Sequence, residues 1–303
     1  MKKQDAILAI VIPVYNRAGI VERTLASLAA QTLRPLHIVL VDNASTDSTY
    51  MVLQDWKNTV QTDGFIVDIL QCPVPGAAAA RNMGFTAVNE PWTMFFDSDD
   101  IMPPTHAEKV VSHINGADVI GWDVEEISGS KRRILTFVHS GREHYDNLFH
   151  GGMATQRWAA RTELFRSAGG WNETVRYWDD IELGARVLAL NPRITAIGRS
   201  GIIKVTDSAT ITNSALGKPE MSLNALRLIE DTLTKAIGAS KARLWCATKL
   251  AIECGVTDRN GCRTGKRLLL TLPAIPTSAK WAYLHTRSGL PGAARILKQL
   301  NIL

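Results

Sequence analysis

The stretch Trp92-Thr93-Met94-Phe95-Phe96-Asp97-Ser98-Asp99-Asp100 joins a short, mostly apolar run to a dense acidic cluster. Carboxylates this close repel one another, and at the end of a buried strand they require a cation or hydrogen-bond donors nearby. Oxygen-rich clusters of this kind suit Mg²⁺ or Mn²⁺, which in turn bind phosphates. A plain acidic turn that caps the next helix is the competing interpretation, so the surrounding pattern has to decide.

The segments around this stretch alternate between strand-like and helix-like patterns. Such an alternation predicts a mainly parallel sheet with helices on both faces. Ligands bind at the carboxyl ends of the strands in such sheets, and both Asp42 and Asp97 follow a predicted strand. The expected strands are 7–14, 37–41, 65–70 and 92–96; the expected helices are 19–32, 48–57, 76–88 and one opened by a capping box of Thr105 and Glu108.

The rest of the chain changes character twice. Strands are expected at 118–124, 133–138, 194–197 and 201–205, with a helix at 178–190. From about residue 216 the pattern is helical: an apolar stripe ends at Gly238, a helix starts at Ser240, and a short basic helix spans 291–300. We therefore expect an α/β domain at 1–215 and a basic helical extension at 216–303.

The bulk composition places the chain among globular proteins that bury a core. Of its 303 residues, 46% are hydrophobic and 21% are charged. No apolar run reaches the roughly 18 residues of a spanning helix. The N-terminus resembles an export signal, but Asp5 interrupts it and no cleavage site follows. We expect a cytoplasmic protein with free, buried thiols at Cys72, Cys246, Cys254 and Cys262.

Charge is distributed unevenly along the chain. Residues 1–215 carry a net charge of −4, whereas residues 216–303 carry +9. Together with apolar residues such as Trp281 and Leu290, this charge suits a peripheral contact with the inner membrane face. A helical buttress with a solvated basic face explains it equally well. No nucleic-acid-binding motif accompanies the charge, so no nucleic-acid partner is expected.

Three further motifs contain residues that turn or capping chemistry leaves unexplained. After the second strand, Asp42 can accept hydrogen bonds from a nucleobase or a ribose. In the small-residue run 76–84, Arg81 is placed to meet phosphate or carboxylate. Asp179 and Asp180 open a helix, where the helix dipole alone favours them, but one could also be a general base. Trp171 and Trp178 beside them are interpreted either as stacking partners for a sugar or as core residues.

Taken in order, these stretches resemble the family 2 glycosyltransferases, which are inverting enzymes with the GT-A fold. The resemblance covers about the first 210 residues, and several motifs in the same order are far more specific than any one of them. The stretches that carry it are Ile12-Pro13-Val14-Tyr15-Asn16-Arg17, Val41-Asp42-Asn43-Ala44-Ser45-Thr46-Asp47, Gly76 to Gly84, Asp97-Ser98-Asp99, Gly169-Gly170-Trp171-Asn172-Glu173 and Asp179-Asp180-Ile181-Glu182-Leu183.

The resemblance implies a role for each matching residue. The donor-binding set would be Pro13, Tyr15, Arg17, Asp42, Arg81, Asp97 and Ser98, with Asp42 on the base. Asp99, with Asp97 in the metal shell, would bind Mg²⁺ or Mn²⁺. Asp180 would be the catalytic base, with Asp179 beside it. Many members add a downstream histidine as a metal ligand, and this chain has none at 203–208. Either Lys204 or Asp207 would contact the diphosphate or the metal instead, or metal dependence would be weaker than is usual in the family.

The predicted activity is transfer of a sugar, most simply from a UDP-sugar, to a hydroxyl of a glycan or lipid-linked acceptor with inversion. A catalytically silent nucleotide-sugar-binding subunit of a polysaccharide synthesis assembly is the alternative. A nucleotidyltransferase would carry a Gly-rich basic loop where Val14-Tyr15-Asn16-Arg17 stands. A dehydrogenase would carry G-x-G-x-x-G there.

Overall fold

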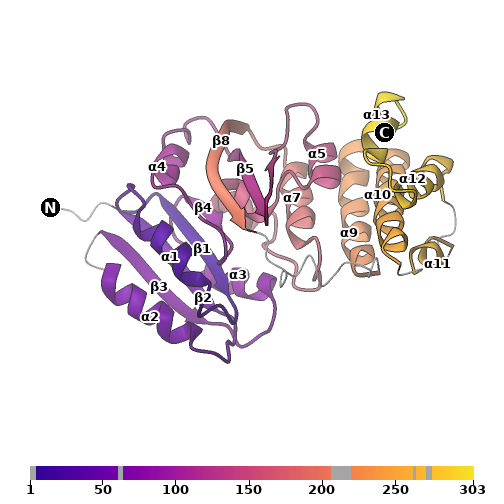
Figure 1. Cartoon of the computed structure of the whole chain (residues 1–303). Coiled ribbons are helices and arrows are strands. Elements are labelled where there is room, and N and C mark those ends of the chain that lie inside the picture. Colours follow the sequence, from indigo (N-terminus) through magenta and orange to yellow (C-terminus); the bar gives the residue numbers. More distant parts are fainter. Residues whose placement is uncertain (1–4, 61–63, 206–219, 262–263, 271–274) are drawn as a thin grey trace.

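The computed structural model describes residues 5–60, 64–205, 220–261, 264–270 and 275–303 (Figure 1). Eight strands form one mixed sheet in the order β3-β2-β1-β4-β7-β5-β6, and β8 pairs with β5. The predicted fold class, a mainly parallel sheet flanked by helices with helices at the C-terminal end, is confirmed. The strands are β1 (Leu8–Val14), β2 (Leu36–Asp42), β3 (Phe65–Gln71), β4 (Trp92–Phe95), β5 (Val119–Ser128), β6 (Lys131–Leu135), β7 (Trp158–Arg161) and β8 (Ile194–Val205).

Strands β3, β2, β1 and β4 are parallel, and their register aligns the ends that carry the predicted site. Val14 of β1 lies opposite Asp42 of β2, and Val11 lies opposite Phe95 of β4. The loops after these strands therefore emerge at one edge of the sheet. This edge gathers Asp42 and the Asp97–Asp100 turn.

Alternate residues of the central strands face two different helical layers. Ile10 and Ile12 belong to a core shared with α1 (Val21–Ala29), α2 (Thr49–Val60) and α4 (His106–Val111). Ala9 and Val11 belong to a core shared with α3 (Ala77–Thr86), α6 (Thr162–Ser167) and α7 (Asp179–Ala189). A Cβ at Gly84 of α3 would lie 2.5 Å from Val11 Cγ1, so this glycine lets α3 approach the sheet closely.

Three local predictions need correction. Thr105 makes no side-chain cap, and Glu108 accepts instead from the Thr32 hydroxyl, so the capping box is wrong. The two strands expected at 194–205 form the single strand β8, because Gly198 and Gly201 adopt positive φ and absorb its bends. Helix α5 (Glu143–His150), the 3₁₀ turn Thr155–Arg157 and strand β7 were not predicted; all are short.

The C-terminal helices pack against the part of the sheet domain that carries α7. The predicted stripe on α9 (Glu220–Ile237) shares one core with α5 and α7, including Tyr145, Ile181, Leu226 and Ile229. Beyond α9 follow α10 (Ala239–Arg259), α11 (Gly265–Leu270), α12 (Thr277–Arg287) and α13 (Ala293–Gln299), at the end of the molecule farthest from β3 (Figure 1). The predicted boundary at 215/216 lies outside the described residues.

Two further predictions from the sequence concern the cysteines and membrane-spanning segments. Cys72, Cys246 and Cys254 are free and buried, as predicted, whereas Cys262 lies outside the described residues. Among the helices that the structure describes, none is both long and apolar enough to cross a membrane.

His37, at the start of β2, predicts a pH-dependent stability. Its ring lies 2.8 Å from Glu90 and 3.1 Å from Asp68. Burial lowers the pKa of His37, but the hydrogen bonds and charges of Glu90 and Asp68 outweigh this and raise it above 6.5. A raised folded-state pKa means that the stabilisation is full below pH 6.5 and is lost as pH rises through the folded-state value.

We compare the free energy of unfolding of the wild type with that of His37→Gln. We expect the wild-type value minus the variant value to decrease as the pH rises from 6.5 through the folded-state pKa of His37. Burial lowers the pKa of His106 to about 3, which acts in the opposite direction, so the difference between the two proteins is the proper readout. Urea unfolding at several pH values measures it, with the exposed His113→Gln as control. A difference that is flat or rises with pH would contradict the assignment.

Candidate active site

The Asp97–Asp100 turn is fixed from below by helix α1. The Thr24 hydroxyl lies 2.9 Å from the Ser98 carbonyl and 2.8 Å from the Asp100 carbonyl, and donates between them. The guanidinium of Arg23 donates to the Asp99 carbonyl at 2.8 and 3.1 Å. These contacts from α1 fix the backbone of the turn without using its carboxylates.

Arg81 connects the two acidic motifs. From α3, its Nη2 donates to Asp97 Oδ1 at 3.0 Å and its Nη1 donates to Asp179 Oδ2 at 2.9 Å. Its guanidinium also lies 4.3 Å from the centre of the Trp171 ring. Although burial lowers the pKa of Arg81, the charges of Asp179 and Asp97 raise it above its ordinary value. A buried, permanent cation thus joins Asp97 to the start of α7.

Burial and neighbouring negative charge disfavour the ionised forms of the other two carboxylates of the turn, Asp99 and Asp100. Burial and the charge of Asp97 raise the pKa of Asp99, while Arg17 and Lys204 lie close enough to oppose this. Burial raises the pKa of Asp100 well above its usual value, and one of its oxygens accepts from the Val205 N–H at 3.0 Å. The site therefore combines uncompensated negative charge with two cations that could face a diphosphate.

Asp42, which the sequence predicts to contact the base, ends strand β2 at this edge of the sheet. It is only 2% exposed, and its Oδ1 has no hydrogen-bond partner among the described residues. A buried carboxylate oxygen without a donor costs free energy unless a ligand supplies one. Tyr15, from the neighbouring loop, is 55% exposed, which leaves its ring available for stacking.

Hydrogen bonds between loops hold this part of the site together. The Asn43 amide donates to the carbonyls of Cys72 and Val74, and its oxygen accepts from the Gly76 N–H at 2.8 Å. The Arg17 N–H donates to the Thr49 hydroxyl at 2.8 Å. The loops after β1, β2 and β3 are therefore linked to one another.

Asn82, next to Arg81, was not predicted to have a role. Its amide donates to the Trp171 carbonyl at 2.9 Å and to Glu173 at 2.8 Å, and its oxygen accepts from the Trp171 N–H. Gly170 has a φ of +67°, and a Cβ there would lie 3.0 Å from the Asn82 oxygen. Asn82 thus holds the Gly169–Glu173 loop in place, which explains the paired glycines structurally.

The two tryptophans considered as sugar platforms are largely buried. Trp171 is 4% exposed and packs edge-on against Phe95 at 5.1 Å. Trp178 is 9% exposed, stacks on Tyr177 and lies under Lys249. Both rings are therefore part of the packing around the site, and the core interpretation applies to them.

Asp179 and Asp180 begin α7, as predicted, but they have different surroundings. Asp179 is bound to Arg81, and burial, assisted by Asp180 and Asp97, raises its pKa to about 6 against the opposing charge of Arg81. Asp180 accepts from the Ile181 N–H at 2.8 Å through Oδ1. Asp179 is thus anchored by a side chain, whereas the hydrogen bond of Asp180 in the described part of the chain is to the backbone.

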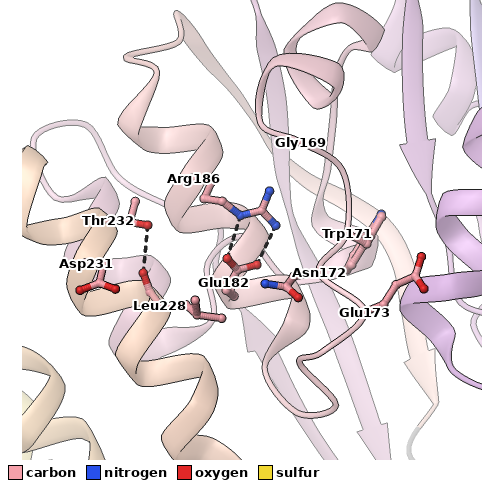
Figure 2. A pocket seen from close by; sticks show the side chains of 9 residues that line it. All are labelled: Gly169, Trp171, Asn172, Glu173, Glu182, Arg186, Leu228, Asp231 and Thr232. Atoms are coloured by element: carbon pink, nitrogen blue, oxygen red, sulfur yellow. Dashed lines mark hydrogen bonds and ion pairs between the residues drawn. The ribbon is translucent and has the colours of Figure 1, made fainter.

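An open cleft of about 560 Å³ lies farther along α7 (Figure 2). The Glu182–Arg186 pair forms its wall on α7, and residues of α9 and of the loop before α7 complete it. These are Leu228, Asp231 and Thr232 of α9, and Gly169, Trp171, Asn172 and Glu173 of the loop. It contains none of the carboxylates at the sheet edge. Trp171 connects the two regions, because it lines the cleft and its ring also contacts the Arg81 guanidinium.

The carboxylates at the sheet edge are suitable ligands for a divalent cation. Asp97 and Asp99 offer two carboxylates, and Mg²⁺ commonly binds one or two carboxylates together with substrate phosphates. One oxygen of Asp97 is engaged by Arg81. Within the described residues, no group of three His, Cys, Asp or Glu side chains forms a metal site. Lys204 lies close enough to Asp99 to lower the pKa of that carboxyl, whereas Asp207 lies outside the described residues.

Comparison with known proteins identifies the family. The model of glycosyl transferase family 2 matches residues 9–166, which is more than half of the 303 residues. The chain belongs to glycosyl transferase family 2. The matched segment contains β1 from Ala9 onward, β2 to β7, Arg81 and the Asp97–Asp100 turn, but ends before Asp179.

Curated relatives of this family 2 chain are similar over part of their length. The succinoglycan biosynthesis protein ExoW of Rhizobium meliloti is 34% identical over 102 residues, which cover 33% of this chain and 31% of that protein. A validoxylamine A glucosyltransferase of Streptomyces hygroscopicus is 32% identical over 108 residues, which cover 35% of this chain and 25% of that protein. The match thus spans about a third or less of these relatives.

Solved structures share the fold of this family 2 chain over most of its length. S. aureus TarS in complex with UDP-GlcNAc has a TM-score of 0.67 at 18% identity, covering 92% of this chain and 79% of that one. The mannosyltransferase PcManGT from Pyrobaculum calidifontis, in complex with GDP-Man and Mn²⁺, has a TM-score of 0.57 at 17% identity, covering 99% and 89%. At these identities the likeness concerns the fold alone.

Proposed function

We propose that the chain transfers a sugar from a UDP-sugar to a hydroxyl of a glycan or lipid-linked acceptor, with inversion of the anomeric centre. The observation that supports this proposal is the double ion pair of Arg81, which joins Asp97 of the acidic turn to Asp179 at the start of α7. A donor bound at the turn would therefore have its reacting carbon within reach of a base on α7. The binding of nucleotide sugars by TarS and PcManGT is consistent with this use of the fold.

In the proposed site, the donor lies across the carboxyl ends of β1, β2 and β4. Asp42 accepts a hydrogen bond from the base, and Tyr15 and Pro13 line the same pocket. Arg17 and Lys204, the cations near Asp99, contact the diphosphate. Asp99 and Asp97 would hold a divalent cation, which supplies charge neutralisation to the diphosphate.

The proposed reaction is a single displacement. The oxygen of the acceptor hydroxyl attacks the anomeric carbon from the face opposite the nucleotide, and Asp180 removes the proton of that hydroxyl at the same time. The bond to the diphosphate breaks, and Arg17 and Lys204 stabilise the charge that develops on it. Arg81 keeps Asp97 and Asp179 in place and does not take part in proton transfer. A silent binding subunit would retain the donor site but not require Asp180.

The acceptor side of the proposal rests on the cleft beside α7. Its lining combines amide, carboxylate and hydroxyl side chains of Asn172, Glu173, Asp231 and Thr232. Such planar and hydroxyl groups are suited to hydrogen bonds with sugar hydroxyls. We place the non-reacting sugars of a glycan acceptor there, since the cleft follows α7 away from Asp180.

Donor binding can be tested through Asp42. We expect the wild type to bind UDP in isothermal titration calorimetry, and Asp42→Ala to bind it about 10–100-fold more weakly, because a hydrogen bond to a charged group is lost. The exposed Asp55→Asn on α2 serves as a control that removes a carboxylate elsewhere. Wild-type indifference to UDP in the presence of Mn²⁺, or undiminished affinity in Asp42→Ala, would refute this placement of the base.

A further inference from the structure

Helix α12 has one buried face and one exposed face. Ala279, Ala282, Tyr283 and Thr286 are buried against α10, and a Cβ at Gly255 of α10 would lie 2.8 Å from the Tyr283 carbonyl oxygen. The exposed face carries Lys280, Trp281, Leu284 and Arg287 at helical spacing. Trp281 is 36% exposed and Leu284 is 60% exposed. This helix is therefore fixed tightly in place while it presents large apolar side chains to the outside.

The exposed apolar residues form one surface with the turn that follows the helix. The Trp281 ring stacks on the His285 ring at 4.6 Å. The same His285 contacts the Pro291 carbonyl at 3.1 Å, and its own carbonyl accepts from the Leu290 N–H. Leu290, which is 55% exposed, is thereby held by the same His285 on which the Trp281 ring stacks. We call Lys280, Trp281, Leu284, Arg287 and Leu290 the α12 surface.

The charge around the α12 surface is predominantly positive. Residues 259–303 contain eight Lys or Arg and no Asp or Glu. The exposed Arg259 also reaches this turn, because a Cβ at Gly289 would lie 3.8 Å from its Cδ. The preceding acidic residue, Asp258, accepts from the Tyr283 hydroxyl at 2.6 Å and from the N–H groups of Gly265 and Lys266. Its charge is thus engaged by these donors and by Arg287, which lies close enough to lower the pKa of Asp258.

Exposed apolar side chains are concentrated in the same segment. Among the described residues, eleven large apolar side chains are exposed, and five of them lie between residues 281 and 302. Scattered single residues of this kind are normal on a protein surface, but a cluster of them within a basic segment indicates a binding surface. Aromatic and aliphatic side chains that penetrate the lipid interface, next to Lys and Arg, are the combination that binds anionic membranes.

We propose that the α12 surface docks the chain onto a membrane that contains anionic lipids. Charge complementarity favours this occupant over a second copy of the chain, since two such surfaces would repel each other. The bulky apolar side chains favour it over a nucleic acid, for which a basic groove with planar stacking partners would be expected. Strands β1, β2 and β4, whose ends carry the proposed donor site, lie apart from α12, so docking through α12 leaves that site accessible (Figure 1).

Vesicle flotation of the full chain tests this proposal without any assay of activity. Binding is expected to vesicles with about 30% phosphatidylserine and not to phosphatidylcholine alone, and it should weaken in about 0.5 M salt. The double variant Trp281→Ser/Leu284→Ser removes apolar contact and should lower the partition coefficient about 10–100-fold. The variant Lys280→Glu/Arg287→Glu reverses the charge and should lower it by a similar factor.

The matched control is Met51→Ser/Lys57→Glu on α2, which removes an apolar and a basic residue at the opposite end of the molecule (Figure 1). It should float like the wild type, and all variants should keep the wild-type circular dichroism spectrum and UDP affinity. The proposal is overturned by equal flotation of wild type and α12 variants. It is also overturned if the α12 substitutions abolish a dimer, or abolish binding to DNA, while vesicle binding is absent.

Discussion

Replacing Asp180 by asparagine is expected to lower kcat for sugar transfer by about 10²–10⁴-fold, the usual contribution of a general base. Asparagine has nearly the same shape and can still accept from the Ile181 N–H, so the start of α7 should keep its structure. UDP affinity should change little, because the proposed base acts on the acceptor and not on the nucleotide. Single-turnover transfer and calorimetric UDP binding, measured on the same preparation, separate these two effects.

Asp179→Asn is the informative comparison, because the two residues are adjacent and only Asp179 pairs with Arg81. We assign Asp179 a positioning role, so its amide should lower kcat less than the Asp180 substitution does. Were Asp179 the base, activity would instead fall as pH drops through its pKa of about 6, because the carboxyl would become protonated. A large loss in Asp179→Asn with near-normal turnover in Asp180→Asn would exchange the two roles.

Local sequence signals predicted the elements of the sheet edge well. The first four strands and helices occur within a few residues of their expected bounds, because each follows from apolar periodicity and turn residues that act over short distances. Strand β7 escaped prediction because Trp158-Ala159-Ala160-Arg161 is short and lies between β4 and β5 only through long-range pairing. Its four residues alone do not distinguish a strand from a loop.

The side chains that assemble the site were harder to predict than those that face the ligand. Thr24 belongs to the buried stripe of α1, and the sequence pattern marks it only as a helix residue; its hydroxyl nevertheless holds the backbone of the acidic turn. Asn82 likewise carries no local signal, although it fixes a loop 89 residues away. A carboxylate cluster is visible in a sequence because the residue type itself is unusual there. A positioning hydrogen bond depends on the tertiary structure and has no such mark.

For Arg81, the sequence predicted the kind of partner but not which residues those partners are. The sequence predicted that Arg81 would meet phosphate or carboxylate, and it meets two carboxylates at once. Which two could not be read from spacing, because Asp179 lies 98 residues further along the chain. The pairing also changes its proposed role: a guanidinium that is already shared between Asp97 and Asp179 organises the site rather than waiting for a ligand.

Replacing Arg81 by methionine is therefore expected to destabilise the fold as well as the site. The substitution leaves two mostly buried carboxylates without their cation, and breaking such a pair costs about 3–5 kcal/mol. Because Asp97 and Asp179 retain 27% and 21% side-chain exposure, we expect about 3 kcal/mol, the lower end. Urea unfolding of the two proteins measures the loss.

The double variant Arg81→Met/Asp179→Asn separates lost charge compensation from lost packing. If uncompensated charge causes the loss, removing the Asp179 charge should restore about 1–2 kcal/mol relative to Arg81→Met, even though one more native side chain has been changed. Arg81→Lys should lie between wild type and Arg81→Met, since an ammonium keeps the charge but cannot donate to two carboxylates with the geometry of a guanidinium. A double variant that is no more stable than Arg81→Met would show that the contact with Trp171, and not the joining of Asp97 to Asp179, is what Arg81 contributes to the fold.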